Sequence, residues 1–154
     1  MCGIAGYLGE ISNSNNLLSE MINEINHRGP DDNGIWSDEN AGIGFAHSRL
    51  SILDLSSAGH QPMHSISNNL VMIFNGEIYN HNAIRLELEK ISRRNWHGHS
   101  DTETLLAAIE EWGLYKALGK IKGMFAIALW DKLNKKLSLV RDRLGEKPLY
   151  YGWV

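Results

Sequence analysis

Two kinds of hydrophobic spacing alternate along the 154 residues of this chain. Short apolar runs typical of buried strands occur at residues 2–8 and 70–74. Elsewhere apolar residues recur every three or four positions, as they do on the buried face of an amphipathic helix. This spacing predicts helices at residues 17–25, 84–91 and 105–112.

Further short strands are predicted in the middle and the last third of the chain, at residues 34–37, 43–47, 51–55, 124–130, 137–141 and 149–154. Strands and helices are therefore grouped rather than strictly alternating. This order favours a layered α+β fold over βαβ winding. Because the last predicted strand has no polar tail, we expect residues 1–154 to form one domain that is truncated at its C-terminal end.

Composition narrows the class of protein. The net charge of −3 and the pI of about 6.1 give no electrostatic reason for a nucleic-acid or anionic-membrane partner. The longest apolar run, residues 124–130, is too short to span a bilayer. With 21% charged residues and one cysteine that cannot form an internal disulfide, we expect a cytoplasmic protein with a free thiol.

That cysteine, Cys2, is the first candidate for chemistry. Removal of Met1 would leave Cys2 with a free α-amine beside its own thiol. An unperturbed α-amine titrates near roughly 7.7–8.0 and a thiol near about 8.5, so the amine can accept the thiol proton close to neutral pH. A lone cysteine more often packs as a small apolar residue, and its position alone favours that structural interpretation.

The dipeptide Asn75-Gly76 follows an apolar strand, where it would ordinarily indicate a hairpin turn. The residues after it have helical rather than strand spacing, so we place the dipeptide at a strand-to-helix junction. At such a junction the Asn75 carboxamide and the Gly76 N–H could both donate hydrogen bonds to an oxyanion.

Two charged residues could recognise a substrate. Arg49 lies among apolar and small residues, and its planar guanidinium matches a carboxylate, although a solvated surface arginine is commoner. Asp101 precedes a predicted helix, where an N-cap role is the usual one. Taken singly, each is best explained as structural. His97 and His99 are closely spaced, but no further ligand completes a metal-binding pattern, and we expect no metal.

Eight ordered segments together closely resemble the class II glutamine amidotransferase domain of asparagine synthetase B-type enzymes: MCGIAGYLG, HRGPDDNG, HSRLSILDL, GHQPM, FNGEIYN, GHSDTE, GMFAIALWD and RDRLGEKPLYY. The resemblance implies an N-terminal-nucleophile hydrolase fold, a four-layer αββα sandwich of two antiparallel sheets. It implies no cofactor for this domain. ATP and Mg²⁺ would serve only a synthetase domain, whose Ser-Gly-Gly-x-Asp-Ser loop is absent from this sequence.

The resemblance also implies roles for individual residues. Cys2 corresponds to the nucleophile, with its own α-amine as base, and Asn75 and Gly76 correspond to the oxyanion hole. Arg49 corresponds to the residue that holds the glutamine α-carboxylate, and Asp101 to the one that binds the α-ammonium. Further positions that match the lining of the glutamine pocket, partly through backbone groups, are Leu50, Ser51, Ile52, Leu53 and Glu77.

The function implied is hydrolysis of L-glutamine to glutamate and ammonia through a Cys2 thioester. A synthetase domain, in the same or a separate chain, would use the ammonia to amidate aspartate or a related carboxylate, and the full enzyme could be a homodimer. Two alternatives stay open. One is an amidase acting on another amide, against which the pair Arg49 and Asp101 argues. The other is a non-catalytic regulatory or interaction domain, expected if Met1 is retained.

Overall fold

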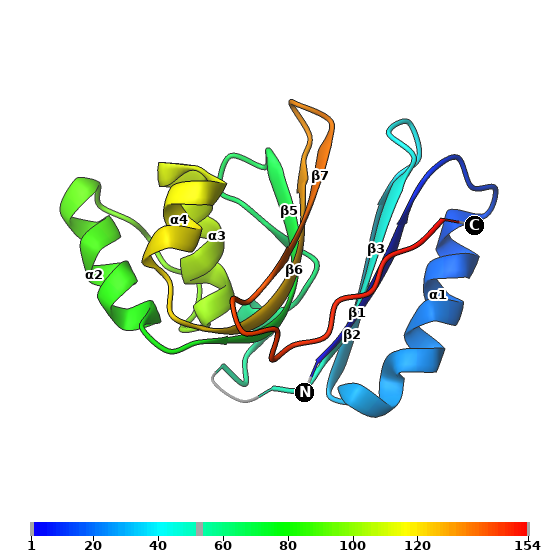
Figure 1. The fold of residues 1–154 in the computed structure, drawn as a ribbon, viewed down its shortest axis with the longest axis horizontal. Helices are drawn as coiled ribbons and strands as arrows, with labels where there is room; N and C mark the ends of the chain where they lie inside the picture. The colour runs from blue at the N-terminus through cyan, green and yellow to red at the C-terminus, as the bar shows by residue number, and fades with distance from the viewer. Residues whose placement is uncertain (1, 52–53, 154) are drawn as a thin grey trace.

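The structure is a computed structural model that describes residues 2–51 and 54–153. Figure 1 shows four layers: helix α1, a three-stranded sheet, a four-stranded sheet and the group α2, α3 and α4. The α+β αββα sandwich expected from the sequence is thus confirmed. The elements in chain order are β1 (Gly3–Leu8), α1 (Ser14–Ile25), the 3₁₀ helix η1 (Asn26–Arg28), β2 (Asp32–Asp38), β3 (Ile43–Arg49), the 3₁₀ helix η2 (Ser57–Gly59), β4 (Met63–His64), β5 (Leu70–Ile78), α2 (His81–Ile91), α3 (Asp101–Trp112), α4 (Leu114–Lys120), β6 (Gly123–Asp131) and β7 (Lys136–Arg141).

The first sheet has the order β1-β3-β2, with both pairings antiparallel, and its central strand β3 is buried along its whole length. Side chains alternate between the two faces of a strand. Ile43 and Phe45 pack in the core between the sheets, so His47 and Arg49 face the same gap. Strand β3 therefore carries an apolar surface at one end and ends in polar side chains at the other.

The second sheet has the order β4-β5-β6-β7. Strands β5 and β6 pair antiparallel over nine residues each. Val71 and Ile73 of β5 face the first sheet, whereas Phe74 and Ile78 face the helices. By the same alternation Asn75 points into the gap between the sheets. Because β4 pairs only with the start of β5, the rest of β5 has no neighbouring strand on that side within the described chain.

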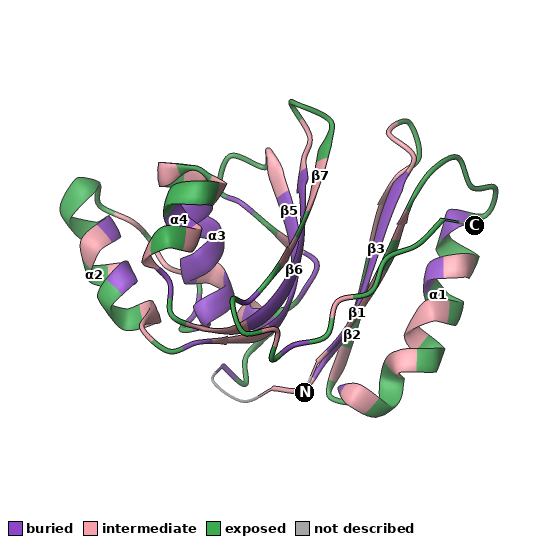
Figure 2. Ribbon diagram, viewed as in Figure 1, coloured by how far each residue is buried: buried purple, intermediate pink, exposed green. Residues whose placement is uncertain are grey.

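Two apolar cores hold the layers together, and Figure 2 shows their buried residues on the central strands and on α3. One core lies between the four-stranded sheet and the helices. The other lies between the sheets and consists of Ile43, Phe45, Val71, Ile73, Ala128 and Trp130. The second core stops short of one end of the gap, where His47, Arg49 and Asn75 are buried instead. That end of the gap is polar.

The predicted position of Asn75-Gly76 at a strand-to-helix junction is wrong. Both residues lie inside β5, opposite Ala126 and Phe125, and α2 begins later, at His81. The apolar run ends at Phe74 because the inner face of β5 there lines a polar pocket, while the backbone ladder continues.

Two predicted strands are also wrong in the described residues. At 51–55, Ser51, Asp54 and Leu55 are not in a strand, and positions 52 and 53 lie outside the described residues. The Ser51 N–H instead donates to the carboxylate of Asp31. Residues 149–153 pair with no strand in the described chain, and Tyr150, Tyr151 and Trp153 are largely exposed. Helix α4 was not predicted, because seven residues are too few to show a helical period.

Candidate active site

A pocket of about 100 Å³ opens at the polar end of the gap between the sheets. Its wall is drawn from distant parts of the chain: the segment before β1, the end of β3, strand β5, the start of α3 and the segment after β7. Seven residues predicted as site residues line it, namely Cys2, Arg49, Leu50, Asn75, Gly76, Glu77 and Asp101. Long-range folding therefore brings the candidate nucleophile, oxyanion donors and charged residues together.

Cys2 is held beside the end of β3. Its Sγ accepts a hydrogen bond from the Leu50 N–H at 3.4 Å and lies 3.7 Å from the Leu50 carbonyl oxygen, to which the thiol can donate. The Arg28 Nε donates to the Cys2 carbonyl oxygen at 3.1 Å. The half-buried thiol thus lies at the pocket wall with its backbone restrained, and the Leu50 N–H can stabilise a thiolate.

The edge of β5 presents three backbone N–H groups on the side away from β6. The Phe74 N–H donates to Gln61 Oε1 at 2.7 Å, and the Ile78 N–H donates to Asp101 Oδ2 at 2.8 Å. N–H direction alternates along a strand, so the Gly76 N–H between them points the same way. Among residues 2–51 and 54–153 it has no acceptor, and the Asn75 carboxamide has no hydrogen-bond partner either. Two adjacent donors are free for a ligand.

The position of Gly76 excludes any side chain. A Cβ atom there would lie 2.2 Å from the Met124 carbonyl oxygen and 2.7 Å from Phe125 Cα. The opposite residue, Phe125, makes its backbone contacts on the far side of β6, where its oxygen accepts the Asp142 N–H at 2.8 Å. Glycine is therefore needed for the close approach of β6, which helps to hold the free N–H at the pocket.

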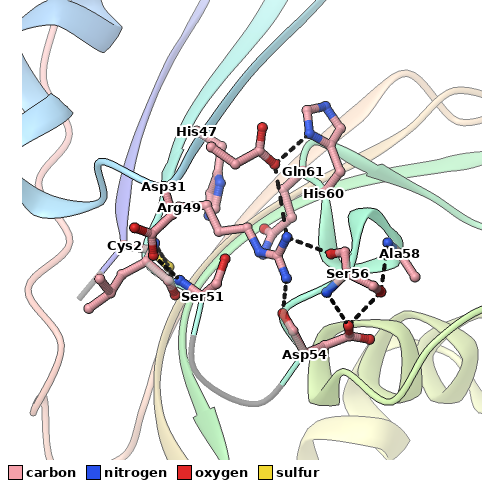
Figure 3. A network of polar contacts seen from close by, with 12 residues as sticks. Cys2, Asp31, His47, Arg49, Ser51, Asp54, Ser56, Ala58, His60 and Gln61 are labelled. Carbon is pink, nitrogen blue, oxygen red and sulfur yellow. Dashed lines mark hydrogen bonds and ion pairs between the residues drawn. The ribbon is translucent and has the colours of Figure 1, made fainter.

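Arg49 is buried, with 7% of its surface exposed, and a loop holds its guanidinium (Figure 3). Nη1 donates to the Ser56 carbonyl oxygen at 2.9 Å, and Nη2 donates to the Asp54 carbonyl oxygen. Asp32 Oδ2 lies 4.0 Å from Nη1. A Cβ on Gly59 would meet Nη2 at 2.1 Å, so a side chain at residue 59 would have to displace the guanidinium from its place under the loop. The solvated alternative for Arg49 is thereby ruled out.

The loop itself is tied together by the Asp54 carboxylate. This group accepts hydrogen bonds from the Ser56 hydroxyl at 2.6 Å, from the Ser56 N–H and from the His99 N–H, both at 2.8 Å. These donors, the Ser56 hydroxyl foremost, lower the pKa of Asp54 to about 2. The carboxylate therefore stays ionised and keeps the loop closed around Arg49 across the neutral range.

Asp101 is the first residue of α3 and is buried at the pocket. The N-cap is Ser100, whose side chain accepts the Glu103 N–H at 3.1 Å, so the N-cap role considered for Asp101 is wrong. Burial raises the pKa of Asp101, although the Ile78 N–H partly opposes this effect. A buried carboxylate of this kind is suited to pairing with a cationic group of a ligand.

Not every predicted residue lines the pocket. Ser51 is described but lies outside the lining, and Ile52 and Leu53 are outside the described residues. Sequence reasoning missed several lining residues, of which Gln61, Thr102 and Lys147 are buried and polar. Gln61, Thr102 and Lys147 lie in GHQPM, GHSDTE and RDRLGEKPLYY, three of the segments that carry the family resemblance, but periodicity gives no signal for a polar side chain buried by the fold. Within the described chain, no group of three or more His, Cys, Asp or Glu could hold a metal ion.

A sequence profile of the glutamine amidotransferase domain matches residues 1–154. The chain belongs to this family. It is 40% identical over 159 residues to asparagine synthetase [glutamine-hydrolyzing] 1 of Bacillus subtilis, covering 100% of this chain and 24% of that protein. It is 34% identical to amidase chry2 of Gibberella zeae, covering 98% of this chain and 24% of that one. This chain thus spans about a quarter of the length of these relatives.

A solved structure supports the fold assigned to this glutamine amidotransferase domain. Glutamine phosphoribosylpyrophosphate amidotransferase from B. subtilis superimposes with a TM-score of 0.66 at 19% identity, over 90% of this chain and 36% of that one. At that identity the likeness concerns the fold alone. None of the helices in the described part of the domain is long and apolar enough to cross a membrane.

Proposed function

We propose that this domain hydrolyses the side-chain amide of L-glutamine to glutamate and ammonia, with Cys2 as the nucleophile. The observation that carries the proposal is the placement of the Cys2 thiol in one pocket with the Asn75 carboxamide and the Gly76 N–H, two donors that have no acceptor in the part of the chain that the structure describes. Donors placed in advance where negative charge develops are the usual means of stabilising an oxyanion.

In the first half of the proposed reaction, removal of Met1 frees the Cys2 α-amine, which takes the thiol proton. The thiolate forms a C–S bond to the amide carbon, and the carbonyl electron pair moves to the oxygen, where Asn75 and Gly76 donate hydrogen bonds. When the oxyanion collapses, the C–N bond breaks. The protonated α-amine of Cys2 gives its proton to the leaving nitrogen, and ammonia is released.

The second half uses the same groups. The α-amine takes a proton from water as its oxygen forms a bond to the thioester carbon, and the negative charge returns to the oxyanion hole. Collapse breaks the C–S bond, the sulfur regains a proton, and glutamate leaves. A single site therefore serves both half-reactions, with no cofactor needed in this domain.

Charge at the pocket supports a free amino acid as the substrate. The Arg49 guanidinium retains N–H groups that the loop carbonyls do not use, and we assign them to the glutamine α-carboxylate. We assign the Asp101 carboxylate to the α-ammonium, with Leu50 and Glu77 contributing to the walls. An acylated amine would leave the buried Asp101 carboxylate without a cationic partner, which disfavours the amidase alternative.

The names of the relatives support a proposal for how the ammonia is used. Two Bacillus subtilis relatives are glutamine-hydrolysing asparagine synthetases, of which this chain covers 24% and 20%. We propose that ammonia from this domain passes to an ATP- and Mg²⁺-dependent synthetase domain that amidates aspartate or a related carboxylate. A free thiol as nucleophile suits a reducing compartment, and we propose the cytoplasm as its location.

Intact mass and turnover together test the proposed function. Purified protein should lack Met1, release glutamate and ammonia in equal amounts from L-glutamine, and gain one covalent adduct with a glutamine-like diazoketone. Cys2→Ala should abolish both turnover and labelling while the protein stays folded. A protein that lacks Met1, yet neither hydrolyses glutamine nor reacts with the diazoketone, would establish the non-catalytic alternative.

A further inference from the structure

Side chains replace a missing strand beside the oxyanion donors. Beyond its short pairing with β4, the edge of β5 would leave its backbone groups unpaired, which is costly in a buried position. At Phe74, the residue just before Asn75, the backbone N–H and the carbonyl oxygen are both bound by side chains. Gln61 accepts the N–H at 2.7 Å, and His47 contacts the carbonyl oxygen at 3.2 Å.

Gln61 is held at both ends of its amide. The group facing the Phe74 N–H must be the carbonyl oxygen, because only an acceptor can bind a donor. The amide nitrogen then donates to Thr102 Oγ1 at 3.4 Å, on the first turn of α3. With 4% of its surface exposed, Gln61 joins β5 to the helix that carries Asp101.

His47 approaches Phe74 from the other sheet. A carbonyl oxygen only accepts, so His47 Nε2 carries the proton and Nδ1 carries the lone pair, which has no partner among the described residues. His47 is fully buried on β3, where Phe45, two residues earlier on the same face, is apolar. A purely packing position would favour another apolar side chain, since an unpaired buried ring nitrogen destabilises the fold.

We propose that Gln61 and His47 are positioning residues that hold the two peptide groups flanking Phe74, Gln61 through the N–H and His47 through the carbonyl oxygen, and so place the Asn75 carboxamide and the Gly76 N–H for oxyanion binding. The inference rests on the proposed glutaminase function. The Phe74 carbonyl belongs to the peptide plane that leads into Asn75, so rotation of that plane turns Asn75 and then Gly76. Arg49 and Asp101, which would bind the α-groups of glutamine, are not part of this peptide.

Gln61→Met and His47→Leu test the proposal. Each replaces a polar side chain with an apolar one of similar size and so removes the hydrogen bond to Phe74. A displacement of catalytic groups by a fraction of an ångström to 1 Å lowers turnover by up to about 100-fold. We expect kcat to fall about 10- to 100-fold in each variant, with KM within about twofold of the wild-type value.

The affinity for glutamate γ-semialdehyde is a readout that would not change if Gln61 and His47 only stabilised the fold. The Cys2 sulfur forms a C–S bond to its aldehyde carbon and the thiol proton ends on the oxygen, so the adduct places an oxygen in the oxyanion hole without a leaving group. Its affinity should fall by the same factor as kcat. Alkylation of Cys2 by iodoacetamide, which needs no oxyanion hole, should keep its wild-type rate.

Ser65→Ala is the matched control. Ser65 Oγ accepts the Leu70 N–H at 3.2 Å, which is the same kind of bond at the opposite end of β5, outside the catalytic pocket. This variant should lose some stability and keep wild-type kcat and semialdehyde affinity. If Gln61→Met and His47→Leu behave like Ser65→Ala, the positioning proposal is overturned.

Further outcomes separate the two proposals. Wild-type protein without glutamine turnover or semialdehyde binding would overturn the proposed glutaminase function itself. If Gln61→Met does not fold, Gln61→Glu decides, because its carboxylate keeps an acceptor for the Phe74 N–H. We then expect a smaller fall in kcat, matched by the fall in semialdehyde affinity. A rise in KM with unchanged kcat in Gln61→Glu would overturn the positioning role.

Discussion

The backbone N–H of Leu50 donates a hydrogen bond to Sγ of Cys2 over 3.4 Å, although 48 positions separate the two residues in the chain. Leu50 directly follows Arg49, whose guanidinium the loop holds at the same pocket. The thiol and the candidate carboxylate-binding group are therefore placed by one stretch of backbone. The distance between them is set by the end of β3, so a substrate of fixed length can be selected.

Arg49→Lys should raise the KM for glutamine about 10- to 100-fold and change kcat much less. A lysine cannot both bind two loop carbonyls and present a planar pair of donors to a carboxylate. Steady-state kinetics give both constants. Arg85→Lys is the matched control, since Arg85 pairs with Glu103 at 3.2 Å outside the pocket lining. A fall in kcat alone in Arg49→Lys would contradict the carboxylate assignment.

Asn75→Ala should lower kcat by roughly 10²–10³, the usual effect of losing one oxyanion donor, with a smaller change in KM. The Asn75 carboxamide has no hydrogen-bond partner within the described chain, so the free energy of unfolding should stay close to that of the wild type. Kinetics and urea unfolding of the same preparation measure both quantities. Unchanged turnover would show that Asn75 is not an oxyanion donor.

Asp101→Asn should raise the KM for glutamine while leaving the domain folded. Its side-chain oxygen can still accept the Ile78 N–H, but the negative charge for the α-ammonium is lost. Burial raises the pKa of Asp101 above its ordinary 3.8. The ionised form is thus disfavoured by folding at neutral pH, and the variant should be no less stable than the wild type there.

The same ionisation predicts a pH dependence of activity. As the pH falls through the raised pKa of Asp101, the carboxylate becomes neutral, and kcat/KM for glutamine should fall in the wild type. This fall should be absent from the profile of Asp101→Asn.

A second substrate tests the assignment of Asp101 to the α-ammonium. Equal turnover of N-acetyl-L-glutamine and L-glutamine by the wild type would support the amidase alternative, since the acetylated substrate has no ammonium group.

His47 should make the stability of the domain depend on pH between about 6.5 and 4. Burial lowers the pKa of His47 to about 4, against the opposing effects of the Phe74 carbonyl and Asp32. The unfolded chain therefore binds a proton at higher pH than the folded one does. Stability attributable to His47 is fully present above pH 6.5 and lost as the pH falls through the folded pKa, at most about 3 kcal/mol.

Urea unfolding at pH 7, 5 and 4 measures this dependence, and His47→Gln is the control. Its amide nitrogen can still donate to the Phe74 carbonyl but does not titrate, so the slope between pH 6.5 and 4 should diminish. Asp54, with its pKa lowered to about 2, loses its contribution only at lower pH. An unchanged slope in His47→Gln would assign the effect to other groups.

Local periodicity was enough to predict most of the elements. Helices α1, α2 and α3 and strands β1, β2, β3, β5, β6 and β7 lie where the spacing of apolar residues predicted them. Periodicity failed where side chains, rather than a neighbouring strand, bind the backbone N–H groups. The Asp31 carboxylate binds the Ser51 N–H in the segment predicted as a strand, and such contacts between distant residues leave no periodic trace.

The sequence by itself determined the layered α+β class and, through its motifs, the candidates Cys2, Arg49, Asn75-Gly76 and Asp101. Only the tertiary structure decided that these residues share one pocket and that Arg49 is buried rather than solvated. It also decided that the Gly76 N–H has no acceptor among the described residues, whereas the Phe74 and Ile78 N–H groups on the same edge of β5 are both bound. Whether a polar group is free depends on strand register and on burial by remote residues, and neither is encoded in the local order of amino acids.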